Sequence, residues 1–331
     1  MKGAAAALLW ALCLIAGAPA RAQGYDTRPE VRAFVDEMVA RHGFLEDELR
    51  AVFARAQRVE PALQSIRPEQ QPTWAEFRSQ FVNDKRIAAG LEFWRANRAS
   101  LARAERDYGV PAQYVVAIIG VETYYGRHSG RWRVVDALTT LAFDYPARAP
   151  FFRSELEQFL LFARDNGIDV FSVNGSYAGA IGIPQFMPGS ARRYAVDFDG
   201  NGSIDLRGSA ADAIGSVANF LLRHGWHPGE PVQLRVSEIA GDAWRAYADG
   251  AVRPAHSVAE LAEAGLRTER GVPSDTTPAA VIDLAGDLRL GLHNFYVITR
   301  YNRSALYAGA VADLAEALVE RRRPARQRAG K

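Results

Sequence analysis

The sequence contains a single cysteine, Cys13, which lies in the N-terminal segment MKGAAAALLWALCLIAGAPARAQG. This segment joins one lysine, an apolar stretch too short to span a bilayer and the small-residue cleavage motifs APA and ARA. Together these features predict a secretory signal peptide over residues 1–22. A mature chain that begins near Gln23 then has no thiol, which excludes disulfides. Packing must hold the fold, with help at most from a metal ion.

The N-terminus also lacks a good lipidation site. A small residue is needed directly before a lipidated cysteine, whereas Trp10, Ala11 and Leu12 precede Cys13. We therefore expect a soluble exported protein with no lipid anchor at this cysteine.

The chain lacks a strong net charge, because 40 basic and 38 acidic residues leave a formal charge of only +2 over 331 residues. This balance gives no reason to expect a nucleic-acid partner. Basic residues do crowd residues 321–331, where we favour a solvated tail over attraction to an anionic wall polymer or lipid surface. With 48% hydrophobic residues and about two domains' worth of length, the chain can bury a large core.

Two common hydrolytic motifs are absent as well. The sequence has no HExxH motif and no Cys/His cluster, which argues against metal-dependent hydrolysis. Its six histidines include no recognisable nucleophile partner, and the GSYAG segment lacks the strand-to-helix context of a serine elbow.

The hydrophobic pattern predicts a mainly α fold of the α+β class. Helical spacing dominates residues 28–106, with a polar interruption at 60–72, and it returns at 110–121, 150–167 and 294–319. The segments VQLRVSEI and AAVIDLAG are typical of short strands. The expected domains are an N-terminal α domain over 27–105, a core over 106–228, a small β-containing domain over 229–291, a helical return to the core over 292–320 and the tail over 321–331.

Glu122 stands out because it ends the apolar run VVAIIGVE and is followed by two tyrosines and a glycine. Desolvation raises the pKa of a carboxyl group, and a raised pKa is what a general acid needs near neutral pH. We therefore interpret Glu122 as a proton donor at the exit of a buried helix. The alternative is a surface glutamate at a helix C-terminus that points into water.

Glycoside hydrolysis normally uses a second carboxylate. The candidates near Glu122 in sequence are Asp136, Asp144, Glu155 and Glu157. None has an equally apolar context, and the last two lie on an amphipathic helix where we expect solvated side chains. A mechanism with a single acid is therefore to be considered.

The segment VDFDGNGSIDLRGSAADAIG, residues 196–215, has the spacing of a calcium loop. Its oxygen-bearing residues and turn glycine occupy loop positions one, three, five, six and nine: Asp197, Asp199, Asn201, Gly202 and Asp205. Gly208 stands at position twelve, where an acid is usual. Asp212 can close the shell instead, although its simpler role is to cap the next helix. A solvated Asp/Gly turn is the alternative to calcium binding.

Aromatic and amide residues of the kind that bind sugars gather in the same regions. They are Tyr124, Tyr125, Tyr177, Gln185, Phe186, Tyr301 and Asn302. Each of them singly is more often a packing residue than a ligand contact, but the set suits a glycan cleft.

Several motifs in the same order resemble the lytic murein transglycosylase B family, whose members cut bacterial peptidoglycan. The matching segments, between about residues 86 and 311, include AIIGVETYYGRHSG, GSYAGAIGIPQFMPGSARRYAVDFDGNGSIDL, DAIGSVANFLLRHGW and NFYVITRYNRSALYAGAV. The resemblance implies a lysozyme-like helical core at 106–228, an α domain and a small β-containing domain. It also implies a periplasmic monomer that acts on peptidoglycan glycan strands, can work with other cell-wall enzymes and needs no cofactor for its chemistry.

In this resemblance Glu122 matches the catalytic acid of the GVET motif. The acid protonates the glycosidic oxygen between N-acetylmuramic acid and N-acetylglucosamine and then serves as base toward the muramyl C6 hydroxyl, which gives a 1,6-anhydromuramyl end. The resemblance also implies substrate-contacting positions at Ser176, Tyr177, Gln185, Phe186, Tyr301 and Asn302.

The family's structural calcium loop matches at Asp197, Asp199, Asn201 and Ser203, with Asp212 as a substitute for the missing closing acid. Asn201 replaces an acid and Ser203 stands where a histidine occurs, so calcium binding should be weaker. Phe77 and Phe220 occupy positions where tyrosine is familiar, so hydrogen bonds to substrate or to Glu122 can be missing. The alternatives to a transglycosylase are a hydrolytic muramidase, a non-catalytic peptidoglycan-binding protein and a calcium sensor.

Overall fold

The computed structural model describes residues 24–65, 72–269 and 274–323. The predicted signal peptide, the lipidation question at Cys13 and most of the basic tail lie outside these residues. The chain divides into two compact units, residues 1–57 and 58–331, which are described separately. The domain boundaries expected from the sequence remain a prediction.

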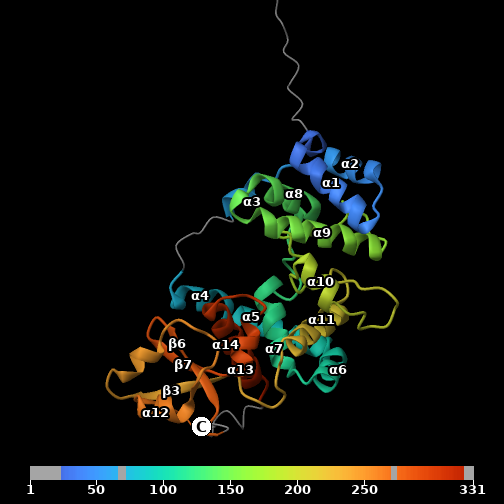
Figure 1. Cartoon of the computed structure of the whole chain (residues 1–331). Coiled ribbons are helices and arrows are strands. Elements are labelled where there is room, and N and C mark those ends of the chain that lie inside the picture. Colours follow the sequence, from blue (N-terminus) through green and yellow to red (C-terminus); the bar gives the residue numbers. More distant parts are fainter. Residues whose placement is uncertain (1–23, 66–71, 270–273, 324–331) are drawn as a thin grey trace, which may run out of the picture. The chain divides into compact units, whose positions relative to one another are not determined.

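The described part of the first unit is a small helical cluster (Figure 1). It contains the 3₁₀ turn η1 (Tyr25–Thr27) and the helices α1 (Pro29–His42) and α2 (Glu46–Arg55). Pro29 begins α1 at a position where its missing N–H has no helical partner to lose. The rings of Phe34 and Phe53 meet edge to face at 6.0 Å and close the small core.

The second unit holds the other helices and all the described strands. Its helices before the sheet are α3 (Glu60–Ser65), α4 (Trp74–Phe81), α5 (Asp84–Ala96), α6 (Arg98–Tyr108), α7 (Ala112–Thr123), α8 (Val134–Asp144), α9 (Ala149–Asp165), α10 (Pro188–Tyr194) and α11 (Ala210–Arg223), with the 3₁₀ turn η2 (Pro146–Arg148) between α8 and α9. The predicted helices at 110–121 and 150–167 are confirmed as α7 and α9. The predicted interruption at 60–72 is wrong at its start, because residues 60–65 form α3.

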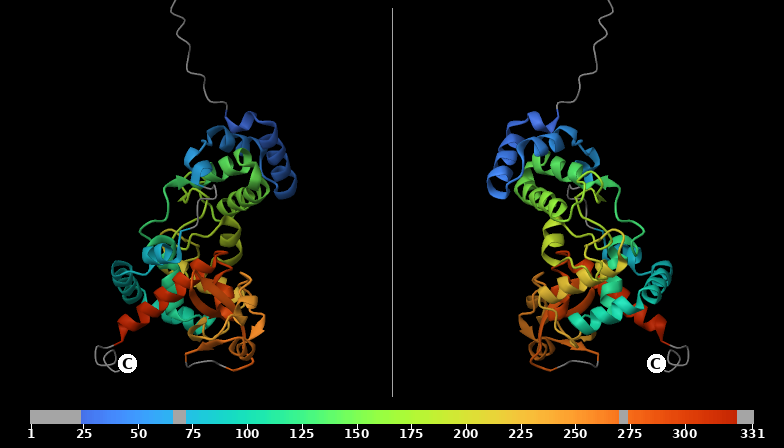
Figure 2. Two further views of the ribbon diagram at one scale, coloured as in Figure 1. Left: turned by 90° about the vertical axis from the view of Figure 1, so that its left-hand side faces the viewer. Right: turned by 90° about the vertical axis from the view of Figure 1, so that its right-hand side faces the viewer.

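Helix α7 is the centre of the second unit. Nine of its twelve residues are buried, which explains its continuous apolar sequence. The C-terminal helix α14 (Ala305–Arg322) packs along α7 and α5, and Figure 2 shows this red helix beside the blue-green ones. Gly309 lies on another side of α14, where a Cβ would come within 3.2 Å of the Trp74 ring of α4.

The predicted helix over 294–319 is interrupted. Instead α13 (His293–Ile298) ends before a turn at residues 299–304, and α14 begins after Ser304, whose side chain accepts a hydrogen bond from the Tyr307 N–H. The break places Tyr301 and Asn302 in the turn and Tyr307 in the first turn of α14.

Two sheets complete the unit. The small one pairs β1 (Trp132–Arg133) with β2 (Asn174–Gly175). The larger antiparallel sheet has the strand order β4-β6-β7-β3-β5. Its strands are β3 (Gln233–Ile239), β4 (His256–Ser257), β5 (Leu266–Thr268), β6 (Pro278–Leu284) and β7 (Asp287–Gly291), with η3 (Ala243–Tyr247) and α12 (Val258–Glu263) between them.

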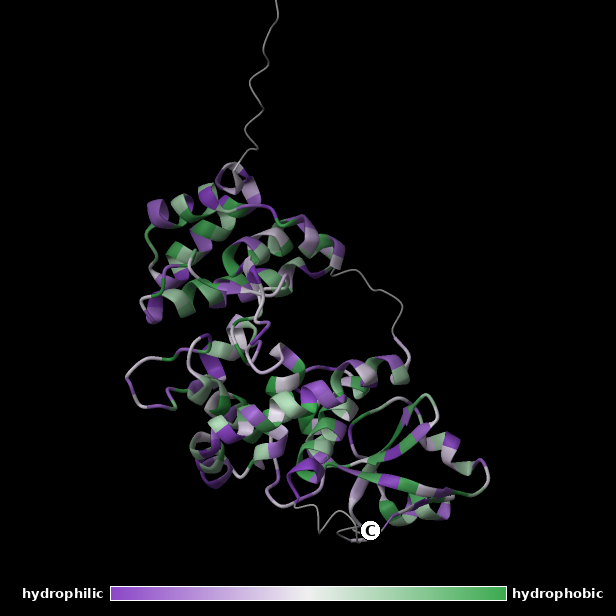
Figure 3. Ribbon diagram, turned by 180° about the vertical axis from the view of Figure 1, so that it is seen from behind, coloured by the Kyte–Doolittle hydropathy of each residue, from purple (hydrophilic) through white to green (hydrophobic). Residues whose placement is uncertain are grey.

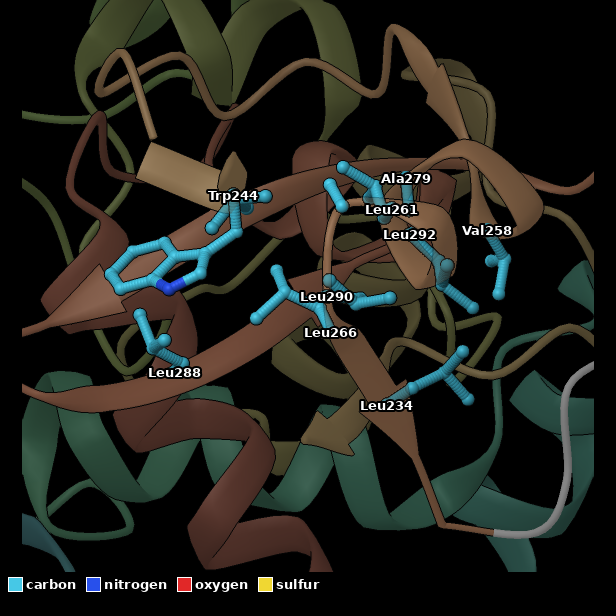
Figure 4. Close-up of a cluster of buried hydrophobic side chains, with 11 residues drawn as sticks. Leu234, Trp244, Val258, Leu261, Leu266, Ala279, Leu288, Leu290 and Leu292 are labelled. Atoms are coloured by element: carbon cyan, nitrogen blue, oxygen red, sulfur yellow. The ribbon is translucent and has the colours of Figure 1, made fainter. Parts of the chain in front are cut away.

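The two strands predicted from sequence are confirmed as β3 and β6. The sheet has its own apolar core, built around Trp244, Leu261, Leu266 and Leu290 (Figure 4). Hydrophobic and hydrophilic residues are both present along its strands (Figure 3), but β6 and β7 each contain four consecutive buried residues, so both faces of the sheet are covered there. The mainly α fold with a small β-containing part is thus confirmed.

Within the described residues, no helix combines the length and the apolar character needed to cross a membrane.

Candidate active site

Glu122 lies in the last turn of α7, where the chain leaves the buried helix. Tyr124 and Tyr125 follow with φ angles of +51° and +63°, in the left-handed region that side chains seldom adopt. Tyr125 folds back over the helix, and Gly120 makes room for it, because a Cβ at that position would come within 2.7 Å of the Tyr125 ring. This strained exit leaves the Glu122 side chain half-buried.

The partner of the Glu122 carboxyl group is Tyr307, from the first turn of α14. Its hydroxyl donates a hydrogen bond of 2.6 Å to Glu122 Oε1. Burial raises the pKa of Glu122 to about 7, and the hydrogen bond from Tyr307 acts in the opposite direction. Neither cause is a neighbouring charge. The carboxyl group can therefore give or take a proton near neutral pH.

The loop at residues 181–186 is fastened to helix α7, which carries Glu122, and to the turn that precedes α14. The Thr123 hydroxyl donates to the Ile183 carbonyl at 2.8 Å, and the Tyr301 hydroxyl donates to the Pro184 carbonyl at 2.5 Å. Burial raises the pKa of Tyr301 well above its usual value, and the negative charge of Glu122 adds to this rise. Tyr301 therefore stays a neutral donor close to Glu122.

Phe186, the last residue of this loop, belongs to an aromatic cluster with Tyr301 and Phe220. It is only 2% exposed, and its ring lies 5.7 Å from that of Tyr301 and 5.6 Å from that of Phe220. The expectation that Phe186 contacts substrate is therefore revised, because in this conformation its ring packs against other rings. Phe220 is also buried, at 5% exposure, and Phe77 packs on Phe81 at 5.0 Å. The hydrogen bond to Glu122 comes from Tyr307 instead.

The other expected substrate residues have mixed surroundings. Gln185 adopts φ +51°, and its side-chain amide donates to the Ser129 and Gly182 carbonyls at 3.0 and 2.8 Å. The Ser176 hydroxyl accepts from the Ala178 and Ala180 N–H groups at 3.3 and 3.0 Å. Both polar groups thus shape their own loops. Two more residues are open to solvent: Tyr177, at 39% exposure, and Asn302.

Of the alternative acids, two are held by arginines. Asp136 receives a 2.6 Å bond from Arg133, and Asp144 pairs with Arg58 at 3.2 Å. Both carboxylates are thus engaged in ion pairs with residues other than Glu122.

Glu155 corrects an expectation, because it is buried at 8% exposure rather than solvated. Burial raises the pKa of Glu155, while a 2.7 Å hydrogen bond from the Gly189 N–H and the charge of Arg193 lower it. The carboxylate thus accepts a hydrogen bond from a backbone N–H in the first turn of α10 and stabilises the start of that helix. It is a second perturbed acid, but its polar contacts are with α10.

The predicted calcium loop brings three carboxylates together. One oxygen each from Asp197, Asp199 and Asp212 lies within 4.8 Å of the others. Backbone N–H groups of Gly200 and Gly202 hold Asp197 at 2.7 Å each, and they lower the pKa of its carboxyl. These are hard oxygen ligands in a preformed turn, and they fit calcium.

The capping role suggested for Asp212 is wrong, because Ser209 is the N-cap of α11. Asp212 lies in the first turn and is fully buried, and its carboxylate accepts backbone N–H bonds from Phe198, Asp199 and Asp205 at 2.7–3.2 Å. The side chain that closes the loop therefore also shapes it.

Tyr307 was missed at the sequence level, although a signal was present. Ser304 stands three residues before it, which is the spacing of a helix cap to the first turn. Arg86 was missed as well. Its guanidinium donates to the Gly120 carbonyl and lies 4.8 Å from the centre of the Tyr124 ring, so it braces the helix exit. Partial burial lowers the pKa of Arg86.

Known proteins share this sequence pattern. The family described as transglycosylase SLT domain matches residues 26–316. The membrane-bound lytic murein transglycosylase B of Escherichia coli K12 is 38% identical over 308 residues, which cover 89% of this chain and 84% of that protein.

Solved structures share the fold. The catenated lytic transglycosylase SltB1 from Pseudomonas aeruginosa superimposes with a TM-score of 0.86 at 48% identity, over 90% of this chain and 100% of that chain. The Escherichia coli lytic transglycosylase Slt35 in complex with calcium gives a TM-score of 0.78 at 40% identity, over 89% of this chain and 94% of that chain.

Proposed function

The chain belongs to the transglycosylase SLT domain family, and from this premise we propose that it is a peptidoglycan lytic transglycosylase with Glu122 as its single catalytic acid and base. The observation that carries the proposal is the Glu122 carboxyl group itself. It is half-buried, its pKa is raised to about 7, and its hydrogen-bond partner is the neutral Tyr307. This environment suits a group that must both donate and accept a proton.

The reaction uses the two protonation states in turn. Protonated Glu122 gives its proton to the glycosidic oxygen between N-acetylmuramic acid and N-acetylglucosamine, and that bond breaks. The resulting carboxylate then accepts the proton of the muramyl C6 hydroxyl, whose oxygen bonds to C1. The products are a 1,6-anhydromuramyl end and a free N-acetylglucosamine hydroxyl, and Glu122 regains its proton.

An internal nucleophile explains why one carboxylate suffices. The C6 hydroxyl is held in the same sugar ring as C1, so its effective concentration is high and no second base is needed to activate water. Tyr307 stays protonated because burial raises its pKa well above its usual value. It can therefore stabilise the Glu122 carboxylate between the two proton transfers.

The expected substrate residues divide into two roles. We assign direct sugar contacts to the exposed Tyr177 and Asn302 and to the partly exposed Tyr301. Ser176 and Gln185 contribute through the loops that their side chains fasten. The Ser176 hydroxyl, whose oxygen already accepts two N–H bonds, can still donate to a sugar oxygen, and Gln185 Oε1 can accept from a sugar hydroxyl. Phe186 packs against the ring of Tyr301 and so helps to position it.

A structural calcium ion is the second part of the proposal. Asp197, Asp199 and Asp212 would supply carboxylate ligands, with Asn201 and Ser203 as weaker oxygen donors. Support comes from their convergence and from the relative Slt35, which was solved in complex with calcium. Calcium would neutralise three crowded carboxylates next to the loop at residues 181–186, whose Ile183 N–H bonds the Leu206 carbonyl at 2.8 Å. It takes no part in bond cleavage.

We also propose that the protein works as an exported periplasmic monomer on glycan strands. The relative from Escherichia coli is a membrane-bound murein enzyme, whereas Cys13 here has a poor lipidation context. Contacts with other cell-wall enzymes and the five predicted domain boundaries belong to this proposal as well.

The proposal is tested with purified murein and two matched variants. Glu122→Gln removes the titrating group and should lower the release of soluble muropeptides by about a hundredfold or more, with an unchanged circular dichroism spectrum. Glu155→Gln is the control, because Glu155 is also buried with a raised pKa and glutamine can still accept the Gly189 hydrogen bond. It should retain activity. A Glu122→Gln protein that still cleaves murein would contradict the proposal.

A further inference from the structure

A cavity that we call the α13 pocket is lined by neither Glu122 nor Tyr307. It has a volume of about 370 Å³, within the usual range for sites of small ligands. Its walls come from the loop after α11, the approaches to β4 and β6, and α13. The residues that matter for its chemistry are His227, Glu230, Arg253, His293 and Tyr296.

The pocket is rigidly built. The side chain of Asn294, which is fully buried, accepts from the His227 N–H at 2.9 Å and donates to the His227 and Glu230 carbonyls at 2.8 and 3.0 Å. These three bonds lock the loop onto α13. The rings of His227 and His293 stack at 4.0 Å with an angle of 15° between their planes. A ligand would meet a site that is already shaped, which lowers the entropic cost of binding.

The stacked histidines do not suit a metal ion. The lone pair of an imidazole nitrogen lies in the plane of the ring, and a bond to zinc is about 2.0–2.1 Å long. Two nearly parallel rings cannot both direct a lone pair at one ion over that distance. One nitrogen of each ring also has a partner already, His227 Nδ1 with Glu230 at 3.0 Å and His293 Nε2 with the Gly225 carbonyl at 2.8 Å.

The charge that lacks a partner is that of Arg253. Glu230 is engaged by His227, whereas no ion pair or hydrogen bond links the exposed Arg253 guanidinium to any residue in the described part of the chain. The guanidinium lies 5.9 Å from the centre of the Tyr296 ring. A planar guanidinium beside an aromatic wall favours a carboxylate attached to a small apolar body.

We propose that the α13 pocket binds the free C-terminal carboxylate of a short peptide, namely the stem peptide of peptidoglycan. The choice of a peptide follows from the chemistry of murein and rests on the proposed function. The lactyl carboxyl of muramic acid is consumed in the amide bond to its stem, so the free carboxylates of murein lie on the stems. Pro254, Pro278 and Tyr296 give this end an apolar wall.

The position of α13 gives such a contact a use. Its C-terminal end leads within a few residues to Tyr301 and Asn302, which we assign to the sugar cleft. A stem held at Tyr296 would favour the binding of strands that still carry peptides. The pocket is thus a specificity site, remote from the reacting atoms.

The probe is a pair of small peptides, acetyl-D-alanyl-D-alanine and its C-terminal amide, titrated into the Glu122→Gln protein by NMR or calorimetry. The acid should bind, and the amide should bind about tenfold more weakly, because a charge-assisted hydrogen bond is lost. Equal binding of acid and amide, or no binding of either, would overturn the proposal.

Three variants locate the binding. Arg253→Gln should raise the Kd for the acid about tenfold. Arg300→Gln is the matched control, because Arg300 lies 5.7 Å from the same Tyr296 ring but does not line the pocket, and its Kd should not change. Glu230→Gln removes the nearby negative charge and should tighten binding about twofold. An unchanged Kd in a folded Arg253→Gln protein, or the reverse order of these effects, would refute the assignment.

The two proposals can fail separately. The probes contain no glycosidic bond and the protein tested cannot cleave one, so a failure to bind peptide leaves the cleavage reaction standing. Conversely, hydrolytic murein products would overturn the transglycosylase and leave any measured peptide site intact.

Discussion

Two buried or half-buried carboxyl groups, Glu122 beside helix α14 and Asp313 on it, have pKa values shifted in opposite directions. Glu122 meets Tyr307 in the first turn of α14 through one neutral hydrogen bond, and burial raises its pKa to about 7. Asp313, on the middle of α14, is fully enclosed. Burial alone would raise its pKa too, but its bonds to Arg289 and Arg78 outweigh that effect and hold the pKa below the usual value.

The arginines around Asp313 come from three different elements. Arg78 of α4 and Arg289 of β7 reach its carboxylate at 2.6 Å, and Arg235 of β3 reaches it at 3.2 Å. This cluster joins the sheet to α14. The comparison shows that the fold can supply cations to a buried acid when structure requires it. At Glu122 it supplies a tyrosine instead, which leaves the proton free to move.

The largest expected effect comes from removing the negative charge of Asp313, which pairs with the three arginines. Asp313→Asn leaves three guanidinium groups around a neutral amide and should lower the free energy of unfolding by about 3–5 kcal/mol, measured by denaturant titration. Asp84→Asn is the matched control, because its bond with Arg321 is also 2.6 Å long but the Asp84 side chain is 85% exposed. It should cost less than about 1 kcal/mol. Equal losses would show that burial is not what distinguishes the two pairs.

The next effect concerns the uncompensated acid and changes with pH. The pKa of Glu122 is higher in the folded protein, at about 7, than in the unfolded chain, at about 4.5. The contribution of Glu122 to the free energy of unfolding is therefore fully present below about pH 4.5 and is lost as the pH rises through about 7. With about 1.4 kcal/mol per pKa unit, ionised Glu122 costs about 3 kcal/mol of stability at pH 8. Glu122→Gln should therefore be more stable than the native protein at pH 8 and not at pH 4. A difference that does not vary with pH would contradict the raised pKa.

A smaller effect is expected from the Tyr307 hydroxyl. Tyr307→Phe removes a hydrogen bond that lowers the pKa of Glu122, so that pKa should rise by about one unit. Activity that depends on protonated Glu122 falls as the pH increases through its pKa, and this alkaline limb should move upward by the same amount. The pH profile of murein cleavage measures it. A lower rate with an unmoved limb would assign Tyr307 a purely structural role.

The smallest effect is expected at the calcium loop. There an added calcium ion would neutralise the carboxylates, as the arginines neutralise Asp313. Calcium should raise the melting temperature by about 2–4 °C relative to a chelator, since Asp197, Asp199 and Asp212 crowd together. Asp199→Asn should abolish the shift, whereas Ser203→Ala should reduce it only slightly. If the native protein melts at the same temperature with and without calcium, the loop is only a turn and binds no calcium.

The sequence was most informative where a local pattern decides the structure. The apolar run of α7 ends at Glu122 as expected, and the strands β3 and β6 lie where their residues predicted. A long amphipathic pattern also hid a break, because the turn at residues 299–304 depends on the Ser304 cap and on contacts of Tyr301 with a distant loop.

What the sequence could not supply is the pairing of distant residues. Tyr307 meets Glu122 across 185 positions, and Arg78 meets Asp313 across 235. Glu155 looked solvated because its helix is amphipathic, yet it faces α10 and is buried. In each case the deciding fact is which element packs on which, and no short segment encodes that.

The central claim is that Glu122 acts without a second carboxylate because the substrate supplies its own nucleophile. The most direct test is digestion of purified murein in water enriched in ¹⁸O, followed by mass spectrometry of the muropeptides. We predict 1,6-anhydromuramyl ends that carry no label and that disappear in Glu122→Gln. Reducing muramyl ends labelled with ¹⁸O would contradict it, because they would show that water attacks C1.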